Sequence, residues 1–345
     1  MSFMSSSKQL ARLPSEVRLA HYYCFYLHDA IARMFVEYEA ANAMEIKVNF
    51  EGKSKAREFS KNAKRYDPIT ALRHAGLHAE AKRTVLNAIT MAMSSDCAHH
   101  IYEALKCFEK RKIIPGFSLL RKPLLDNLSY FSWMVADENG FYDDFTCGDV
   151  SKITQKKLGN RRKELIANAI KAIEVEGLCS AEQIHDIIFN SKNDSGLYGY
   201  FQHALHLVTV ERLELKTSPE NFNFIFKNPN DDDVYLTLYS VLPLVIFYLA
   251  RVVMHLFDKI SPMDPVSKAA FILRSQAGLL LLRHKGAERM LHIFEGISEA
   301  VECFSCGGAL KITPRNVERI VLTETMRCTK CRRVNGFPFE AFLTV

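Results

Sequence analysis

The sequence contains little glycine and little proline, with 15 and 11 of them among 345 residues. Because these two residue types end helices and shape turns, their scarcity favours long helices over a sheet with many turns. Internal repeats and low-complexity segments are also absent from the sequence. We therefore predict a mainly α-helical, soluble protein.

Common catalytic motifs are missing too. The chain has no glycine-rich phosphate loop, no Walker motif, no Gly-x-Ser-x-Gly nucleophile elbow and no zinc-protease motif of the His-Glu-x-x-His type. Each of these motifs places a nucleophile, a metal ligand or a phosphate-binding backbone. Their absence excludes most of the common enzyme classes.

We also expect neither a signal peptide nor an unbroken membrane span. The start, MSFMSSSKQL, contains no apolar run. The most apolar segment, residues 235–257, contains Pro243, Arg251 and His255, and its unbroken part is shorter than the roughly 20 residues that a span needs. We interpret it as a buried core helix and expect a cytoplasmic protein with no membrane partner. Five scattered cysteines are expected to stay reduced there; they are Cys24, Cys97, Cys107, Cys147 and Cys179.

Apolar residues recur at spacings of three and four along most of the chain, as in buried helices. Ser15 is the expected N-cap of the first helix, and Pro115–Gly116 is an expected break between two later ones. A polar, basic segment at 47–68 predicts a loop with a short helix, and residues 210–233 predict a hairpin or a surface loop. The expected helices lie at about 14–45, 68–75, 77–114, 117–137, 233–260 and 265–297, with two shorter ones in 149–190. We predict a large helical bundle domain over residues 1–300 and a small β module over 301–345.

Four cysteines near the C-terminus have the spacing of a metal site. Cys303 and Cys306 form one Cys-x2-Cys pair, and Cys328 and Cys331 form a second, with 21 residues between the pairs. Two residues between thiolates let one tight turn direct both sulfurs at one ion, and two such turns complete a tetrahedron. The pattern resembles a zinc ribbon, in which two knuckles are carried on a three-stranded sheet.

The zinc-ribbon pattern predicts a structural Zn²⁺ site that is closed to substrate, because the protein fills all four positions. We expect strands at residues 319–328 and 336–345. The first knuckle is followed by glycines, which suit a positive backbone φ. The second knuckle is followed by Arg332, which leaves its shape open.

Positive charge is concentrated around these cysteines. Of the net charge of +6, the segment from Cys303 onward contributes +4, because it has seven basic and three acidic residues. A small basic module favours nucleic acid or another acidic partner. The candidate nucleic-acid-binding residues are Arg327, Lys330, Arg332 and Arg333.

Polar residues on two apolar helices are candidates for a second site. Arg251, His255 and Asp258 share one helical stripe at i, i+4 and i+7. Either this stripe lines a polar cleft, in which His255 acts in acid–base chemistry, or it is the solvent face of the helix. Arg121 flanks another apolar stripe, next to an expected surface ion pair between Lys122 and Asp126.

Two segments resemble a group of bacterial helical proteins. Residues 117–137, FSLLRKPLLDNLSYFSWMVAD, have the form Leu-Leu-Arg-x-Pro-Leu, and YFQHALHLVT later supplies a short helix with a histidine. Some members of this group resemble the HEPN superfamily, small helical bundles that include RNA-cleaving toxins and phage-defence effectors. The resemblance covers about residues 65–260 and implies a HEPN-like core, with Arg121 and His206 at the matching site positions.

The nuclease motif of the HEPN superfamily, an arginine four to six residues before a histidine, belongs at the start of a late helix. The match in this chain, RHAGLH at Arg73–His78, lies early, and chance supplies such pairs freely in a chain with 12 histidines. Gly76 also weakens the helix that would hold the pair. We interpret RHAGLH as a half-exposed turn.

Two functions are consistent with the sequence. The leading hypothesis is a non-catalytic interaction protein that binds nucleic acid, RNA or DNA, or a protein partner, in phage defence or a stress response. The alternative is a HEPN-like, metal-independent ribonuclease or toxin, in which a histidine acts as general base and an arginine stabilises a phosphate oxyanion. Its candidate catalytic residues are Arg121, His206, Arg251 and His255. Either protein could form a homodimer.

Overall fold

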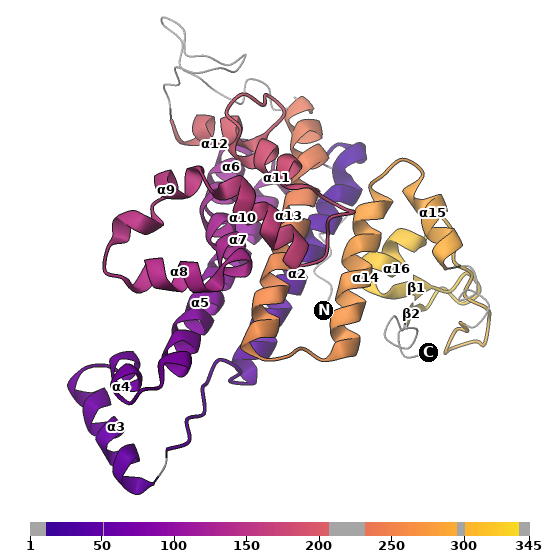
Figure 1. The fold of residues 1–345 in the computed structure, drawn as a ribbon. Coiled ribbons are helices and arrows are strands. Elements are labelled where there is room, and N and C mark those ends of the chain that lie inside the picture. The colour runs from indigo at the N-terminus through magenta and orange to yellow at the C-terminus, as the bar shows by residue number, and fades with distance from the viewer. Residues whose placement is uncertain (1–11, 51, 207–231, 295–300, 338–345) are drawn as a thin grey trace, which may run out of the picture.

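The computed structural model describes residues 12–50, 52–206, 232–294 and 301–337. Helices dominate these residues, which confirms the prediction of a mainly α-helical fold (Figure 1). Most of the expected segment 210–233 lies outside the described residues. The helices of the body are α2 (Arg18–Ala40), α3 (Lys53–Arg65), α4 (Pro68–His74), α5 (His78–Glu109), α6 (Ile113–Arg121), α7 (Leu128–Ala136), α8 (Glu138–Thr146), α9 (Gln155–Gly159), α10 (Arg162–Ala172), α11 (Ala181–Phe189), α12 (Leu197–Leu205), α13 (Asp233–Ile260), α14 (Pro265–Leu281) and α15 (Gly286–Ile293).

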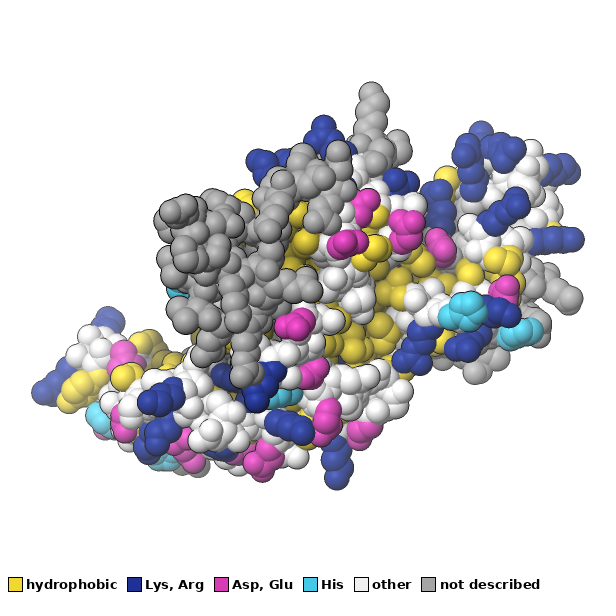
Figure 2. Space-filling view, turned by 90° about the horizontal axis from the view of Figure 1, so that it is seen from above, with side chains coloured by type: hydrophobic (Ala, Val, Ile, Leu, Met, Phe, Trp, Pro, Cys, Tyr) yellow, Lys and Arg dark blue, Asp and Glu magenta, His cyan; other side chains and the backbone are white. Residues whose placement is uncertain are grey.

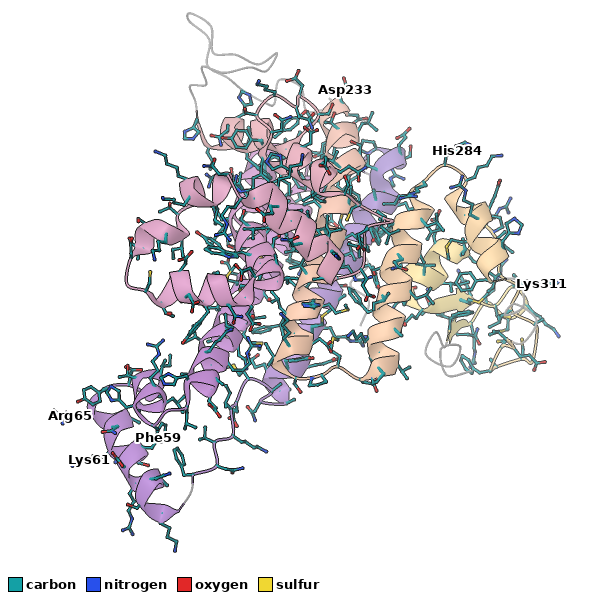
Figure 3. The ribbon with its side chains drawn as sticks, in the orientation of Figure 1. Phe59, Lys61, Arg65, Asp233, His284 and Lys311 are labelled. Carbon is teal, nitrogen blue, oxygen red and sulfur yellow. The ribbon has the colours of Figure 1, made fainter. Side chains whose placement is uncertain are left out.

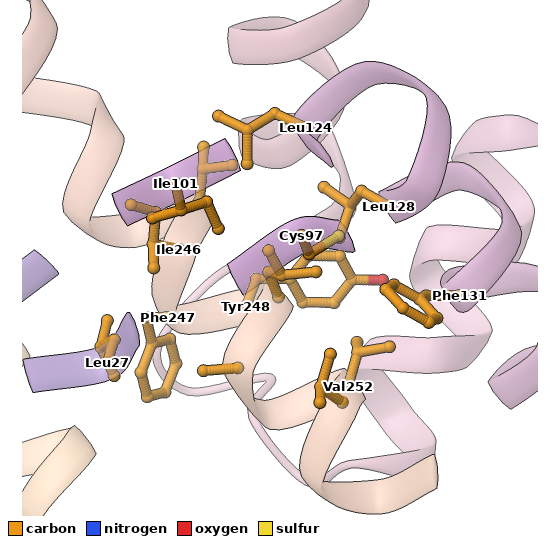
Figure 4. Close-up of a cluster of buried hydrophobic side chains, with 14 of the residues drawn as sticks. Leu27, Cys97, Ile101, Leu124, Leu128, Phe131, Ile246, Phe247, Tyr248 and Val252 are labelled. Carbon is orange, nitrogen blue, oxygen red and sulfur yellow. The ribbon is translucent and has the colours of Figure 1, made fainter. Parts of the chain in front are cut away.

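Helix α13 forms the centre of the body. It packs along α2 and also contacts α5 and α7. Figure 4 shows Phe247 of α13 beside Leu27 of α2, and Tyr248 among side chains of α5 and α7. The hydroxyl of Tyr248 shares a hydrogen bond of 2.9 Å with Ser132 Oγ, so this buried polar group has a partner. α13 is also apolar and long enough to cross a membrane, but 72% of its most apolar window is buried inside the fold. Its interpretation as a core helix is confirmed.

A buried polar network joins the three longest helices. His21 of α2 is fully buried, and its Nε2 lies 3.3 Å from Glu109 Oε1 of α5. Lys106 also pairs with Glu109, and both partners outweigh burial and lower the pKa of this carboxyl. Because an ionised carboxylate only accepts hydrogen bonds, Nε2 carries the proton of the neutral ring, and Nδ1 accepts from Tyr239 Oη of α13.

Two helix limits differ from the prediction. The break after α5 falls at Arg111, whose φ is 57°, and not at Pro115. Pro115 lies in the first turn of α6. Backbone N–H groups in a first turn have no acceptor within the helix, so a proline there costs no helical hydrogen bond. The expected helix 265–297 is interrupted in the same way at Lys285, whose φ is 54°. In both cases a non-glycine residue takes the left-handed conformation.

The predicted N-cap at Ser15 is also wrong. A short 3-10 turn, Ser15–Val17, precedes α2, and the Ser15 hydroxyl donates to its neighbour Glu16 instead of capping α2. Asp67, by contrast, caps α4 from its side chain, which accepts from the Thr70 N–H. Pro68 then begins α4, as predicted.

A π-helical turn, Lys122–Asn127, joins α6 to α7. Such a turn is wider than an α-turn, and it begins next to Pro123, which cannot donate a helical hydrogen bond. The wider turn brings residues five apart onto one face. Arg121 therefore pairs with Asp126, at 3.8 Å, while Lys122 pairs with Asp96, at 2.8 Å. The expected pair of Lys122 with Asp126 is wrong for this reason.

The C-terminal segment folds against α14 and α2. It contains α16 (Val317–Thr323), followed by the antiparallel strands β1 (Thr325–Arg327) and β2 (Val334–Gly336), in which Met326 pairs with Asn335. The expected strand 319–328 is therefore mostly a helix, and of the expected strand 336–345 only Gly336 and Phe337 are described. The apolar cluster of the C-terminal segment includes Ala277 and Leu281 of α14. The division at residue 300 stays a prediction, although the core of this segment reaches back into α14.

Candidate metal centre

The four predicted cysteines converge at one point. Their sulfur atoms all lie within 4.8 Å of one another. The distance is 3.5 Å from Cys303 Sγ to Cys331 Sγ and 3.8 Å from Cys306 Sγ to Cys328 Sγ. A tetrahedral ion with metal–sulfur bonds of about 2.3 Å separates its ligands by about 3.8 Å. The donor set and its size therefore fit a tetrahedral metal ion.

Matching backbone turns hold the two cysteine pairs. In the first knuckle Gly307 N–H donates to the Cys303 carbonyl, and in the second Arg332 N–H donates to the Cys328 carbonyl. Gly307 has a φ of 62° and Arg332 a φ of 64°. The two knuckles therefore have the same shape, although the second lacks a glycine. Arg332 holds a left-handed conformation that costs a residue with a side chain about 1–2 kcal/mol.

The surroundings of the thiols favour ionisation of two of them. Burial opposes ionisation of Cys303, but the N–H groups of Ser305 and Cys306 outweigh it and lower the pKa of this thiol to about 6. The N–H of Cys331 lowers the pKa of Cys328. Gly308 N–H acts in the same direction on Cys306, but burial and the neighbouring thiols raise that pKa to about 11. Negative charge accumulates as the thiols ionise, and a bound cation would relieve it.

Asn335 ties the two knuckles together. This side chain is 3% exposed, and its Oδ1 accepts from the Phe304 N–H at 3.0 Å. Its Nδ2 donates to the Arg333 carbonyl at 3.1 Å. One buried amide thus fixes the first knuckle on β2. The sequence does not predict this role, because a single asparagine outside any spaced motif does not indicate which groups it will contact.

Phe304 is the most exposed aromatic feature of the centre. It lies between the two cysteines of the first knuckle, and 73% of its surface is exposed. Its backbone is held by Asn335, so the ring is presented from a fixed position. One signal for this exposure is present in the sequence: Phe304 lies between two metal ligands, in a tight turn whose side chains face solvent.

The four predicted basic residues lie on and beside the second knuckle, in the same small module as Phe304. Arg327, Lys330, Arg332 and Arg333 are all exposed. Arg327 Nε donates to the Arg332 carbonyl at 3.0 Å, and the Lys330 side chain lies against Gly308 of the other knuckle. Figure 2 shows Lys and Arg side chains gathered at the end of the molecule formed by α15 and the C-terminal segment. The centre is therefore a cysteine cluster in a small module that exposes one aromatic ring and four cations.

A groove of about 160 Å³ lies between α2 and the C-terminal segment. Tyr22 and Tyr26 of α2 line one side, and Arg315 and Arg319 line the other. Glu318 also lines it, and burial raises the pKa of that carboxyl. The mixture of acidic and basic groups gives the groove no preference for an anion.

Arg121 and His206, the positions implied by the resemblance, are not brought together by a contact among the described residues. Arg121 is half-buried and pairs with Asp126. His206 is exposed at the end of α12, where its backbone N–H donates to Gln202.

Arg251 and His255 differ in their surroundings. Arg251 is 3% exposed, and its Nη2 donates to the Ile173 carbonyl at 3.0 Å. The interpretation of this stripe as a solvent face is therefore wrong for Arg251. His255 is half-buried, and burial and Lys259 lower its pKa. Both are described residues, and they share no hydrogen bond.

RHAGLH forms the turn between α4 and α5. Arg73 lies in the last turn of α4 and donates to Tyr142 Oη at 3.1 Å, whereas His78 begins α5 and is exposed. Gly76 between them has a φ of 76°. The interpretation of this stretch as a half-exposed turn is confirmed.

Comparisons of this chain with protein-family models, with curated proteins and with solved structures returned no significant match.

Proposed function

We propose that this protein is a cytoplasmic nucleic-acid-binding protein, in which a Zn²⁺ ion holds a small module that contacts single-stranded RNA or DNA. The observation that carries the proposal is the exposed ring of Phe304 on a cysteine knuckle, in a module that also exposes four cations.

Zinc is the metal that suits the donor set best. Four thiolates in a tetrahedron are the usual ligands of structural zinc, and Fe–S clusters are the other common occupant of such sites. The closest sulfur pairs, at 3.5 and 3.8 Å, match the edge of a tetrahedron around one ion. All four positions come from the protein, so this ion would have a structural role.

Single-stranded nucleic acid suits the surface around that ion. Proteins that bind single strands combine aromatic rings, on which bases stack, with cations that contact the phosphates. Phe304 would supply the ring, and Arg327, Lys330, Arg332 and Arg333 would supply the cations. A protein partner is a weaker candidate, because the module that exposes Phe304 and Val334 also carries four exposed cations, whereas the buried centre of a protein interface is poor in charge.

The ribonuclease alternative has less support. General acid–base catalysis needs a histidine within hydrogen-bond reach of the reacting groups, with a partner to stabilise the developing charge. Arg251 is buried against the Ile173 carbonyl and shares no hydrogen bond with His255. Arg121 is engaged by Asp126.

Binding of a labelled single-stranded oligonucleotide to the full chain tests the proposal. Phe304→Ala should weaken binding by about 5- to 150-fold, because stacking on one aromatic ring contributes about 1–3 kcal/mol per base. Fluorescence polarisation gives the Kd of each variant.

Phe145→Ala is the matched control, since Phe145 is 42% exposed but lies on α8, away from the cysteines. It should leave the Kd unchanged. Equal affinities of the wild type and Phe304→Ala, or no binding of RNA and DNA by the wild type, would overturn the proposal.

A further inference from the structure

Helix α3 carries the densest positive charge of any described helix. Its 13 residues, KSKAREFSKNAKR, include six basic side chains and one acidic side chain, Glu58. At about 100° per residue, five of the six fall within an arc of about 120° around the helix axis, with Lys55 outside it. We call these five the basic face of α3; they are Lys53, Arg57, Lys61, Lys64 and Arg65.

The basic face points away from the body. α3 and α4 form an arm at the beginning of α5, on the side of the molecule opposite the cysteine centre (Figure 1). In Figure 3 Lys61 and Arg65 lie on the outer side of α3, and Phe59 lies on its inner side. All five residues of the basic face are exposed.

The opposite face of α3 is used within the protein. Ala56, Phe59 and Ala63 are half-buried, and the ring centre of Phe59 lies 5.0 Å from that of Phe50. α3 also packs against α4. The arm is therefore held by its apolar side and leaves only its charged side for a partner.

Charge on the basic face is not neutralised by the described part of the chain. Lys53, Arg57, Lys61 and Lys64 make no ion pair with any described residue, and Arg65 only stacks over the Tyr66 ring, at 5.2 Å. Several unpaired cations on one exposed helical surface repel one another, which destabilises the helix slightly. A polyanionic partner would relieve this repulsion.

The chemistry of this face excludes two kinds of partner. A helix that lies in a membrane surface inserts large apolar side chains into the lipid, but the apolar residues of α3 are occupied by packing. A protein interface needs an apolar or aromatic centre, and the basic face has none. The partner that fits this face is a nucleic acid, whose backbone presents phosphates at regular intervals.

Two further features indicate a duplex. The basic face itself contains no aromatic ring, and the neighbouring exposed ring, Tyr66, already stacks with Arg65 and packs edge-on against His74. α3 is roughly 20 Å long, which matches about six phosphates along each strand of B-DNA. The major groove of B-DNA, about 12 Å wide, admits an α-helix, whereas the deep and narrow major groove of an RNA duplex does not.

We propose that the basic face of α3 binds the phosphate backbone of duplex DNA along its major groove, without reading sequence. This inference does not rest on the function of the cysteine centre, because the two surfaces lie on separate elements and contact different forms of nucleic acid.

The test compares two variants of the full chain that lose the same charge. The arm variant carries Lys53→Gln, Lys61→Gln and Lys64→Gln. The control variant carries Lys156→Gln, Lys157→Gln and Lys171→Gln, three exposed lysines of α9 and α10 that make no ion pair with a described residue. Circular dichroism checks that both remain folded.

Binding of a short labelled DNA duplex is measured by fluorescence polarisation over a range of salt concentrations. The arm variant should bind about 10- to 100-fold more weakly at 0.1 M salt, and the slope of log K against log salt should fall by about 2–3, since each lost phosphate contact removes about 0.9. The control variant should match the wild type. Phe304→Ala should also match the wild type on the duplex, which separates this inference from the proposed function.

Three results would contradict the inference. The first is an unchanged duplex affinity and salt slope in the arm variant. The second is an equal loss in the control variant, which would indicate net charge alone. The third is an arm-dependent affinity as strong for an RNA duplex of the same sequence, or for phosphatidylserine vesicles, as for the DNA duplex.

Discussion

Arg332 and Gly307 occupy equivalent positions after the second cysteine of each knuckle. Both hold a φ above 60°, which glycine tolerates and arginine adopts at a cost. Arg332→Gly removes that cost but adds the larger chain entropy of glycine in the unfolded state, so we expect a net stabilisation of about 0.5–1 kcal/mol. Thermal unfolding of the zinc-loaded chain measures it.

Gly307→Ala is the reciprocal change and should destabilise the module by about 1 kcal/mol. A Cβ at this position meets no atom within 4 Å, so the effect would come from the backbone alone. Destabilisation of the module by Arg332→Gly would mean that the side chain contributes more than its conformation costs.

At the residue scale, the metal ligands could be predicted and their surroundings could not. The spacing of Cys303, Cys306, Cys328 and Cys331 reflects a local requirement, two thiolates on one turn, and local requirements are visible in a sequence. The burial of Asn335 and of Arg251 depends on which distant segments cover them. Arg251 lies in an apolar helix, and only the position of α10 shows that a backbone carbonyl receives its guanidinium.

The three longest helices, α2, α5 and α13, meet at the buried His21. Tyr239→Phe removes one hydroxyl and leaves His21 Nδ1 buried without its donor. We expect a loss of about 1–3 kcal/mol in the free energy of unfolding, which is the cost of an unsatisfied buried polar group. Urea denaturation followed by circular dichroism measures it.

Tyr102→Phe provides the control for this change. Tyr102 lies on α5, is half-buried, and its hydroxyl makes no hydrogen bond with a described residue. It should change the unfolding free energy little. Equal effects of Tyr102→Phe and Tyr239→Phe would show that the network does not stabilise the contact of these helices.

At the element scale, helix periodicity predicted the long elements and failed at short ones. Residues 317–323 place Val317, Ile320 and Val321 at the helical spacing i, i+3 and i+4, but the apolar run 320–322 also fits a short buried strand. Tertiary contacts decide for the helix: Arg274 of α14 donates to the carbonyls of Val321 and Leu322, which are left without partners at the end of α16. The π-helical turn Lys122–Asn127 could not be predicted either, because it changes which residues share a helix face and leaves no mark in the amino-acid composition.

At the scale of the whole molecule, the two proposed nucleic-acid surfaces lie on opposite sides of one helical body. The cysteine centre carries an aromatic ring with cations, which suits unpaired bases. The basic face of α3 carries cations alone, which suits a duplex. If both proposals hold, we expect a nucleic acid with a double-stranded and a single-stranded part to contact both surfaces.

The body and the cysteine module should depend on zinc to different degrees. The main apolar cluster of the body contains no cysteine of the centre, whereas the cluster around the module includes Cys303 and Cys328. Removal of zinc should therefore unfold the module while most of the helical circular dichroism signal remains. The reason is that metal binding stabilises the module that contains the ligands and not the helical body.

Single-strand binding as a function of free Zn²⁺ tests the central claim most directly. The full chain is stripped of metal with a chelator and titrated with Zn²⁺, while its Kd for a labelled single-stranded oligonucleotide and its metal content are followed. We predict that binding is lost in the metal-free chain and returns as one zinc ion per chain is bound. Full affinity in the metal-free chain, with its helices intact, would contradict the account.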